Sequence, residues 1–389
     1  MNHTSSDSKW LLSSKDSYYS PTNTPLLTTA YIFDKALHDF SNLIANKQNH
    51  DYPKDNLVES VEDIDWLMSV FEKKFLPKLK IPDYFCFNIP ETIKKLQEEM
   101  QKSYPSISIK QNESEVEEES SANIFAKDKD DILEEFIVKH TVRMGASIEG
   151  PTLNFQEIAK NLSENSQKYS YELYKMVFTR LNERQKIKIH DILNEALKSV
   201  RDSAIYKIVT CKNSLITLEN TLFPIYFTEL SNGEVAANNG WILFADPREN
   251  FAESENLNYL RRNIVIWDDL VKLRYGEKKS DSTFLWKYMK KYVQSSASIF
   301  HGFRIDNAHS TPLHVGEYFL KKARESNPNL HVICELFCGG QDLEAKYVKI
   351  LGANALVKEV LNVIPLFYLN KAYFYSVMNW NISQERCIL

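Results

Sequence analysis

The sequence predicts an α/β fold built on part of a parallel (β/α)8 barrel that carries a largely helical insertion. Three observations predict it. Residues 297–306 and 330–337 are short, mostly apolar runs, and each precedes a helical pattern that begins near Pro312 or Asp342. Apolar strands that alternate with helices are typical of parallel sheets buried on both faces. Residues 167–206 keep near-3.6 apolar spacing without Gly or Pro, which indicates a long helix outside this alternation.

Four segments follow from these patterns. Residues 1–50 begin with a loop rich in Ser, Thr, Asn and Pro and form the first barrel segment. Residues 51–230 form a mostly helical insertion with an acidic, solvated loop near 103–131. Residues 231–360 supply the catalytic barrel strands and helices, and residues 361–389 form a divergent tail. The runs that begin at Ile205 and Gly240 are expected to be strands because they are rich in β-branched and aromatic residues.

Composition excludes several classes of protein. The 389 residues include 43% hydrophobic and 25% charged residues, which is the balance of a globular protein. A net charge of −5 gives no basis for capture of nucleic acid or of an anionic membrane. The five cysteines contain no CxxC pair, so neither a disulfide framework nor a zinc site is expected. The N-terminus lacks a signal pattern and no apolar run could span a bilayer, so we expect a cytoplasmic protein.

Two carboxylates occur where the predicted parallel strands end. Asp306 follows the first apolar run and Glu335 lies at the end of the second, with room between them for one crossover helix. Chemistry in such barrels is found at the carboxyl ends of strands. Retaining cleavage of a glycosidic bond needs a nucleophilic carboxylate and a second carboxyl group that acts as acid and then as base. The spacing permits this pair without requiring it.

Neighbouring residues strengthen the catalytic interpretation. Arg304 lies two residues before Asp306, so in a strand its side chain points to the same face and can keep Asp306 ionised. The alternative for Arg304 is a structural ion pair. Glu335 is flanked by apolar residues, which should raise its pKa and suit it to act as a general acid.

Several motifs resemble one family. The segment Gly302-Phe-Arg-Ile-Asp-Asn-Ala-His-Ser-Thr-Pro resembles the nucleophile segment of the α-amylase superfamily, in the version found in eukaryotic glycogen debranching enzymes. His331-Val-Ile-Cys-Glu-Leu-Phe is similar to the acid/base segment. Asn2-His3 resembles the end of the first sugar-binding motif, and Asp246-Pro-Arg-Glu-Asn-Phe-Ala and Val271-Lys-Leu-Arg-Tyr-Gly also look like the debranching enzyme.

The resemblance implies a TIM barrel of the α-amylase type and a role for each matching residue. Asp306 would be the nucleophile, Glu335 the acid/base and Arg304 the partner of the nucleophile. Asn2 and His3 would lie near the sugar bound before the scissile bond, and His309 would reach the acceptor side.

Two aromatic residues are further candidates for sugar platforms. For both Trp241 and Tyr275, core packing is the expected role, because large aromatic side chains more often fill a protein interior.

The chain also departs from the family pattern. A later His-Asp motif with a third carboxylate is missing, and the resemblance ends near Val360. The first motif begins at the start of the chain, without the family's preceding strands. We therefore expect an interior piece of a longer debranching enzyme, with a partly open barrel and weak or no catalysis.

The resulting functional hypothesis is a 4-α-glucanotransferase that acts on glycogen and maltooligosaccharides through a covalent glycosyl–Asp306 intermediate. The alternatives are a hydrolytic α-amylase-type glycosidase and a non-catalytic glycogen-binding protein. No cofactor or metal is expected, because no cluster of oxygen ligands is identifiable. No nucleic-acid or membrane partner is expected either.

Overall fold

The structure is a computed structural model that describes residues 2–109, 129–143, 150–242, 246, 249–337 and 341–357. The predicted tail, residues 361–389, and positions 110–128 of the predicted acidic loop lie outside the described residues. The chain divides into two compact units. One comprises Met1–Pro77 and Glu195–Leu389, and the other comprises Lys78–Asn194. We call the first the catalytic unit, because it contains the predicted catalytic residues Asp306 and Glu335, and the second the helical unit.

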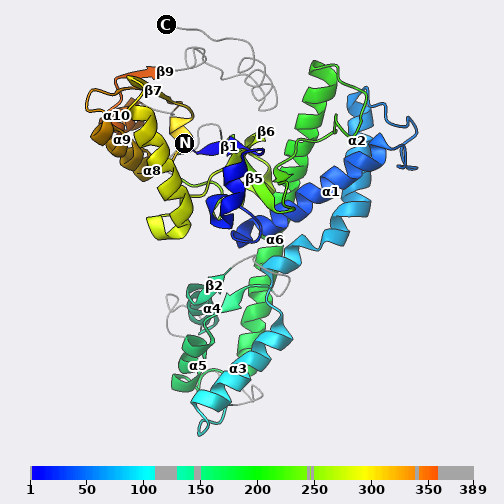
Figure 1. Ribbon diagram of the computed structural model, residues 1–389. Helices are drawn as coiled ribbons and strands as arrows, with labels where there is room; N and C mark the ends of the chain where they lie inside the picture. Colours follow the sequence, from blue (N-terminus) through cyan, green and yellow to red (C-terminus); the bar gives the residue numbers. More distant parts are fainter. Residues whose placement is uncertain are drawn as a thin grey trace. The chain divides into compact units, whose positions relative to one another are not determined.

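The chain forms both helices and strands, and the two alternate from α7 to β9, so the α/β class is confirmed (Figure 1). The helices are α1 (Thr28–Ala45), α2 (Val61–Val70), α3 (Ile89–Ser103), α4 (Lys129–Lys139), α5 (Phe155–Glu164), α6 (Tyr171–Ile205), α7 (Asn258–Arg261), α8 (Thr283–Ala297), α9 (Leu313–Ser326) and α10 (Gln341–Leu351).

The catalytic unit holds an antiparallel sheet of four strands in the order β1-β6-β5-β4. These strands are β1 (His3–Ser5), β4 (Phe227–Glu229), β5 (Val235–Trp241) and β6 (Val265–Lys272). His3 pairs with Lys272, which brings the start of the chain to the end of β6. The pairing of β5 with β6 shifts register between Asn238 and Gly240, next to Trp241.

The same unit holds a parallel sheet in the order β7-β8-β9, formed by β7 (Gly302–Ile305), β8 (His331–Glu335) and β9 (Ala355–Val357). Figure 1 shows α8, α9 and α10 beside this sheet. Helix α9 begins after Pro312, whose fixed φ suits a helix start, and it buries Val315, Phe319 and Ala323 on one face. The predicted strand–helix–strand–helix order from residue 297 is confirmed.

The described sheets do not show the predicted partial barrel. Three parallel strands follow the barrel pattern, but the four-stranded sheet of the catalytic unit is antiparallel. One apolar cluster nevertheless contacts both sheets, with Val271 on β6, Ile305 on β7 and Val332 on β8 among its buried residues. Strands β6, β7 and β8 therefore share one core.

The helical unit has a core of its own. Helices α3, α4 and α5 and the first part of α6 bury an apolar cluster that includes Leu96, Ile137, Ile158 and Phe178. A hairpin of β2 (Thr141–Arg143) and β3 (Thr152–Leu153) connects α4 to α5. The long helix predicted over 167–206 is confirmed as α6, Tyr171–Ile205.

Two local predictions were wrong. The run that begins at Ile205 is not a strand, because α6 continues through it into a π-helical turn, η7 (Tyr206–Thr210). The β-branched residues of this run favour a strand, but extending an existing helix by one turn is more favourable here than starting a new strand. Residues 3–5 are a strand and not a loop, because β6 supplies hydrogen-bonding partners that a short polar sequence does not reveal.

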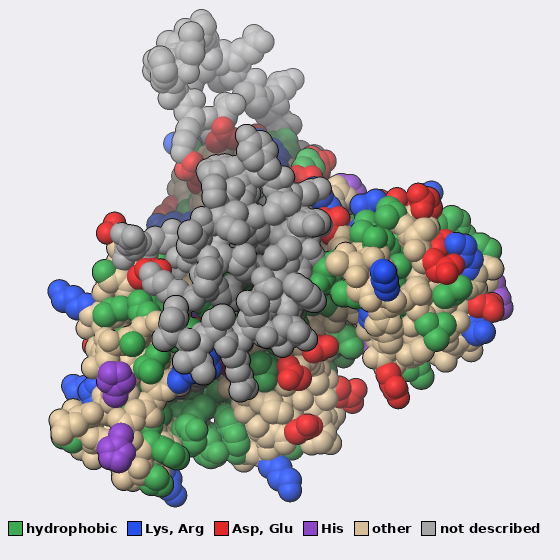
Figure 2. All heavy atoms as spheres, turned by 90° about the horizontal axis from the view of Figure 1, so that it is seen from above, with side chains coloured by type: hydrophobic (Ala, Val, Ile, Leu, Met, Phe, Trp, Pro, Cys, Tyr) green, Lys and Arg blue, Asp and Glu red, His purple; other side chains and the backbone are tan. Residues whose placement is uncertain are grey.

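The surface bears both signs of charge. On the face shown in Figure 2, Lys and Arg side chains lie dispersed among Asp and Glu. None of the described helices combines the length and apolar character needed to cross a bilayer.

Candidate active site

Asp306 and Glu335 lie at the ends of adjacent parallel strands. Arg304 pairs with Ile333 and Ile305 with Cys334, so continuation of this register sets Asp306 level with Glu335. The Arg304 guanidinium bridges the two carboxylates, with one nitrogen 2.8 Å from Asp306 Oδ1 and another 2.9 Å from Glu335 Oε1. The contact expected between Arg304 and Asp306 is therefore present, and the same cation also contacts Glu335.

The backbone after Asp306 contributes a further contact. Asn307 has φ of 48°, in the left-handed region that Asn tolerates better than most residues. In this conformation its N–H donates to Glu335 Oε2 at 2.9 Å, and its side-chain amide donates to Asp306 Oδ2 at 3.3 Å. Asn307 thus contacts, on each carboxylate, the oxygen that Arg304 does not contact.

The two carboxylates differ in exposure. The Asp306 side chain is 43% exposed, whereas that of Glu335 is 17% exposed. Burial raises the pKa of Glu335, and the nearby Asp306 raises it further, while the Asn307 N–H and Arg304 oppose the shift. A raised pKa keeps a proton available on Glu335 nearer to neutral pH. This direction agrees with the expectation from the apolar residues around Glu335 in the sequence.

Asn2 and His3 lie beside Asp306. His3 Nε2 is 3.7 Å from Asp306 Oδ2, and its Nδ1 lies 2.8 Å from Asn2 Oδ1. The Asn2 amide donates to Ser310 Oγ at 2.7 Å and to Asn239 Oδ1 at 3.3 Å. Burial lowers the pKa of His3 to about 4, so the imidazole is uncharged at neutral pH. A neutral ring beside Asp306 leaves this carboxylate without a competing imidazolium partner.

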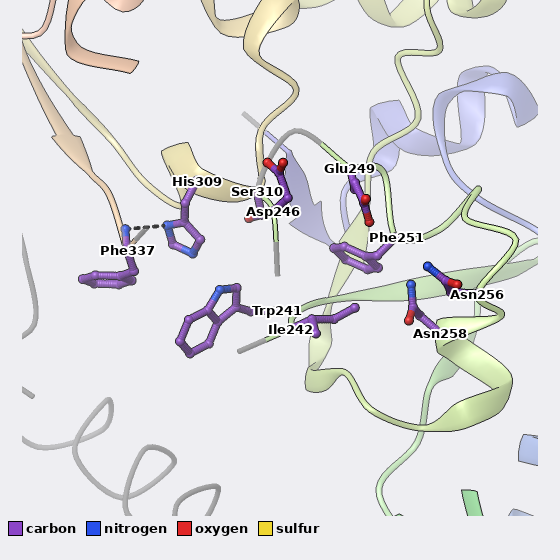
Figure 3. A pocket seen from close by; sticks show the side chains of 10 residues that line it. All are labelled: Trp241, Ile242, Asp246, Glu249, Phe251, Asn256, Asn258, His309, Ser310 and Phe337. Atoms are coloured by element: carbon purple, nitrogen blue, oxygen red, sulfur yellow. Dashed lines mark hydrogen bonds between the residues drawn. The ribbon is translucent and has the colours of Figure 1, made fainter. Parts of the chain in front are cut away.

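His309 is buried at 2% exposure, and burial lowers its pKa to about 4. Its Nδ1 accepts a hydrogen bond of 3.4 Å from the Phe337 backbone N–H, which Figure 3 marks with a dashed line. The rings of Trp241 and Phe337 lie 5.9 Å and 5.0 Å from the imidazole ring. His309 therefore links the loop after β7 to the segment after β8.

A pocket is lined in part by His309 and Phe337, which closely follow Asp306 and Glu335 in the sequence (Figure 3). Its apolar part is formed by aromatic side chains and Ile242, and amide, hydroxyl and carboxylate groups supply the remainder. The lining residues are Trp241, Ile242, Asp246, Glu249, Phe251, Asn256, Asn258, His309, Ser310 and Phe337. Aromatic faces combined with amide and carboxylate groups suit a ligand that has both apolar C–H faces and hydroxyl groups.

The sequence placed some of these residues and missed others. Tyr275 is 1% exposed in the core, as expected, whereas Trp241 lines the pocket and is not simply a core residue. Phe251, Asn256 and Asn258 were not singled out. The motif that begins at Asp246 includes Phe251 and resembles the family, but the resemblance gave no role to any single residue of the motif.

Two comparisons relate the chain to known proteins. The profile of the glycogen debranching enzyme glucanotransferase domain matches residues 1–331. The chain belongs to this family. It is also similar to the glycogen debranching enzyme of Saccharomyces cerevisiae, with 31% identity over 371 residues. This alignment covers 92% of the chain and 24% of the yeast protein, so the chain spans about a quarter of that relative's length.

The family match includes Asp306 and stops before Glu335. The assignment of Glu335 therefore depends on its place at the end of β8 and on its contacts with Arg304 and Asn307.

Proposed function

We propose that this glucanotransferase-family chain carries a 4-α-glucanotransferase site that acts on glycogen and maltooligosaccharides. The observation that carries the proposal is the bridge from Arg304 to both Asp306 and Glu335 at the ends of adjacent parallel strands. One carboxylate is exposed and paired with a cation, and the other is shielded with a raised pKa. A nucleophile and a general acid need these two different environments.

In the first step, Asp306 attacks the anomeric carbon of an α-1,4-linked glucose residue. Arg304 and the Asn307 amide hold the carboxylate in position. Glu335 donates its proton to the glycosidic oxygen as the C–O bond breaks, which releases the shortened glucan. A glycosyl–Asp306 ester results, and Glu335 is left ionised beside Arg304.

In the second step, the ionised Glu335 accepts the proton of a 4-hydroxyl group at the end of an acceptor glucan. The acceptor oxygen attacks the anomeric carbon and displaces Asp306. The two inversions retain the α configuration. Transfer requires that a sugar hydroxyl occupies this position in preference to water, and the aromatic pocket next to Ser310 would favour a sugar.

The remaining site residues have supporting roles in this proposal. His3 lies 3.7 Å from Asp306 and would accept from or donate to a hydroxyl of the donor sugar. Asn2 orients the His3 ring through Nδ1. His309 would contact the acceptor side from the pocket wall.

The proposal extends to architecture and location. We propose that β7, β8 and β9 are strands of an α-amylase-type TIM barrel. The helical unit, Lys78–Asn194, would be the centre of the insertion predicted at 51–230. A cytoplasmic location, where glycogen would be the substrate, completes the proposal.

Incubation with maltoheptaose tests the function. In line with the weak activity expected from the sequence, we expect chain lengths to redistribute slowly with no gain in reducing ends, and we expect Asp306→Asn to reduce the rate by at least about 10³-fold. A gain in reducing ends would show hydrolysis instead. Binding of maltoheptaose without either change would indicate a non-catalytic glucan-binding protein. Asp7→Asn, at an exposed carboxylate of the same unit, is the matched control.

A further inference from the structure

Lys272 is a buried lysine that the mechanism does not use. It is the last residue of β6, and its side chain is 4% exposed. Charged side chains are seldom buried this deeply without a partner of opposite charge. Among the residues that the structure describes, no carboxylate forms an ion pair with the Lys272 ammonium.

Aromatic rings hold the ammonium instead. Lys272 Nζ lies 4.0 Å from the centroid of the Phe251 ring and 5.9 Å from that of Tyr19. A cation above an aromatic face is attracted by the quadrupole of the ring, and the attraction is strongest where water is excluded. The contact with Phe251 is thus the closest interaction found for this charge.

Phe251 is also part of the pocket wall, between Glu249 and the amides of Asn256 and Asn258 (Figure 3). The segment that carries it, residues 249–256, has no helix or strand. Side chains on both sides of Phe251 attach this segment: Asn250 donates to the Tyr19 hydroxyl, and Glu253 lies 3.4 Å from Arg274. Lys272 supplies the central contact of the three.

The position of Lys272 connects this wall with the catalytic residues. Lys272 pairs with His3 across antiparallel strands, so the two side chains share one face of the sheet. His3 in turn lies beside Asp306. The end of β6 therefore supports both the nucleophile's neighbour and the pocket wall.

We propose that Lys272 is a positioning residue that holds Phe251, and with it the segment 249–256, in the conformation that binds a glucan residue next to Asp306. The inference rests on the proposed function for the identity of the ligand. The positioning contact itself does not depend on the ligand.

The protonation state of Lys272 distinguishes a cation–aromatic contact from simple packing, because only the former depends on pH. Burial lowers the pKa of Lys272 to about 7, while Glu253 opposes the shift. The ammonium is therefore charged at pH 6 and largely neutral at pH 8, and the attraction to Phe251 is lost over that interval. His3 and Tyr19 also face Lys272; the pKa of His3 is lowered to about 4 and that of Tyr19 is raised, so both stay uncharged from pH 6 to pH 8.

The first experiment is calorimetric titration of the full chain with maltoheptaose. We expect Lys272→Met and Phe251→Leu each to weaken the Kd about tenfold at pH 6, and the double variant to weaken it no further. The wild-type Kd should rise from pH 6 to pH 8, whereas that of Lys272→Met should not, and Lys272→Arg should bind tightly at both. The matched control is Lys279→Met, because exposed Lys279 lies 3.9 Å from the Tyr318 ring, which does not line the pocket.

The second experiment is hydrogen exchange without ligand. Lys272→Met should increase exchange of the amides in 249–256, and Lys279→Met should not. An unchanged Kd for Lys272→Met, additive losses in the double variant, or unchanged exchange in 249–256 would each overturn the proposal. If the wild type does not bind maltoheptaose but Lys272→Met still increases exchange in 249–256, the proposed function fails and the positioning role is supported.

Discussion

At the scale of single residues, the site depends on one cation between two carboxylates. Arg304 contacts both Asp306 and Glu335, and it opposes the rise in the pKa of Glu335 that burial causes. Arg304 thus has two separable effects, on the orientation of Asp306 and on the proton affinity of Glu335. A variant that removes its charge should reveal both.

We expect Arg304→Gln to reduce kcat about 10²-fold and to shift the basic limb of the pH–kcat profile to higher pH. Glu335 must be protonated to act as the general acid, so activity falls as the pH rises through its pKa. Removal of Arg304 removes a favourable interaction with the ionised form, and the pKa therefore rises further. The measurement is the rate of maltoheptaose disproportionation from pH 5 to pH 9. A basic limb that moves to lower pH would contradict the assignment.

Asn307 is a second residue with a specific requirement. Its φ of 48° disfavours β-branched side chains, while its N–H must stay directed at Glu335. We expect Asn307→Gly to keep this N–H contact and to lose only the side-chain contact with Asp306, so it should retain more activity than Asn307→Val. Asn307→Val should lower the free energy of unfolding by about 1–2 kcal/mol and reduce kcat. Urea denaturation and kcat of both variants test this, and equal effects of Gly and Val would argue against a conformational role.

At the scale of secondary-structure elements, pairing of β5 with β6 positions Trp241 at the pocket. Gly240 lies within this pairing, and a Cβ atom there would lie 2.4 Å from the Val265 carbonyl oxygen. Contact at that distance with backbone cannot be relieved by rotation of a side chain. The strands would have to separate where β5 leads into the pocket.

We therefore expect Gly240→Ala to destabilise the chain by about 2 kcal/mol and to weaken maltoheptaose binding. Gly233→Ala is the comparison, because no atom lies within 4 Å of its added Cβ and only its φ of 77° is unfavourable. Thermal denaturation and calorimetric titration of both variants provide the measurements. Weakened glucan binding in Gly233→Ala alone would contradict the role given to the β5–β6 pairing.

Elements with local signals could be predicted from the sequence. The strand around Phe303, the helix after Pro312 and the strand before Glu335 were predicted because apolar runs and a proline mark them. The short strand at His3 and the pocket wall at Phe251 were not, because each depends on contacts with β6 that are distant in sequence. Motifs therefore singled out Asp306 and Glu335 as candidates, while contacts distant in sequence determine which residues surround them.

At the scale of the whole molecule, each of the two units buries an apolar cluster of its own. Phe319 belongs to the cluster of the catalytic unit and Phe178 to that of the helical unit, and both side chains are fully buried. Replacement of a buried Phe by Ala costs about 3–5 kcal/mol, since it removes apolar contacts and leaves a cavity. Because the clusters are separate, each substitution should lower the free energy of unfolding only of the unit that contains it.

We expect the chain to unfold in urea in two transitions. Hydrogen exchange of peptides from Lys78–Asn194 and from the remainder of the chain would monitor each transition separately. Phe178→Ala should move the transition of the helical unit to lower urea concentration and leave that of the catalytic unit in place. Phe319→Ala should do the reverse and should also abolish maltoheptaose binding at intermediate urea. Helix α6 crosses the boundary between the units, so its exchange identifies the unit with which each half unfolds. If Phe178→Ala moved both transitions equally, the chain would unfold as one cooperative body, and the helical unit would have to be regarded as part of the support of the catalytic site.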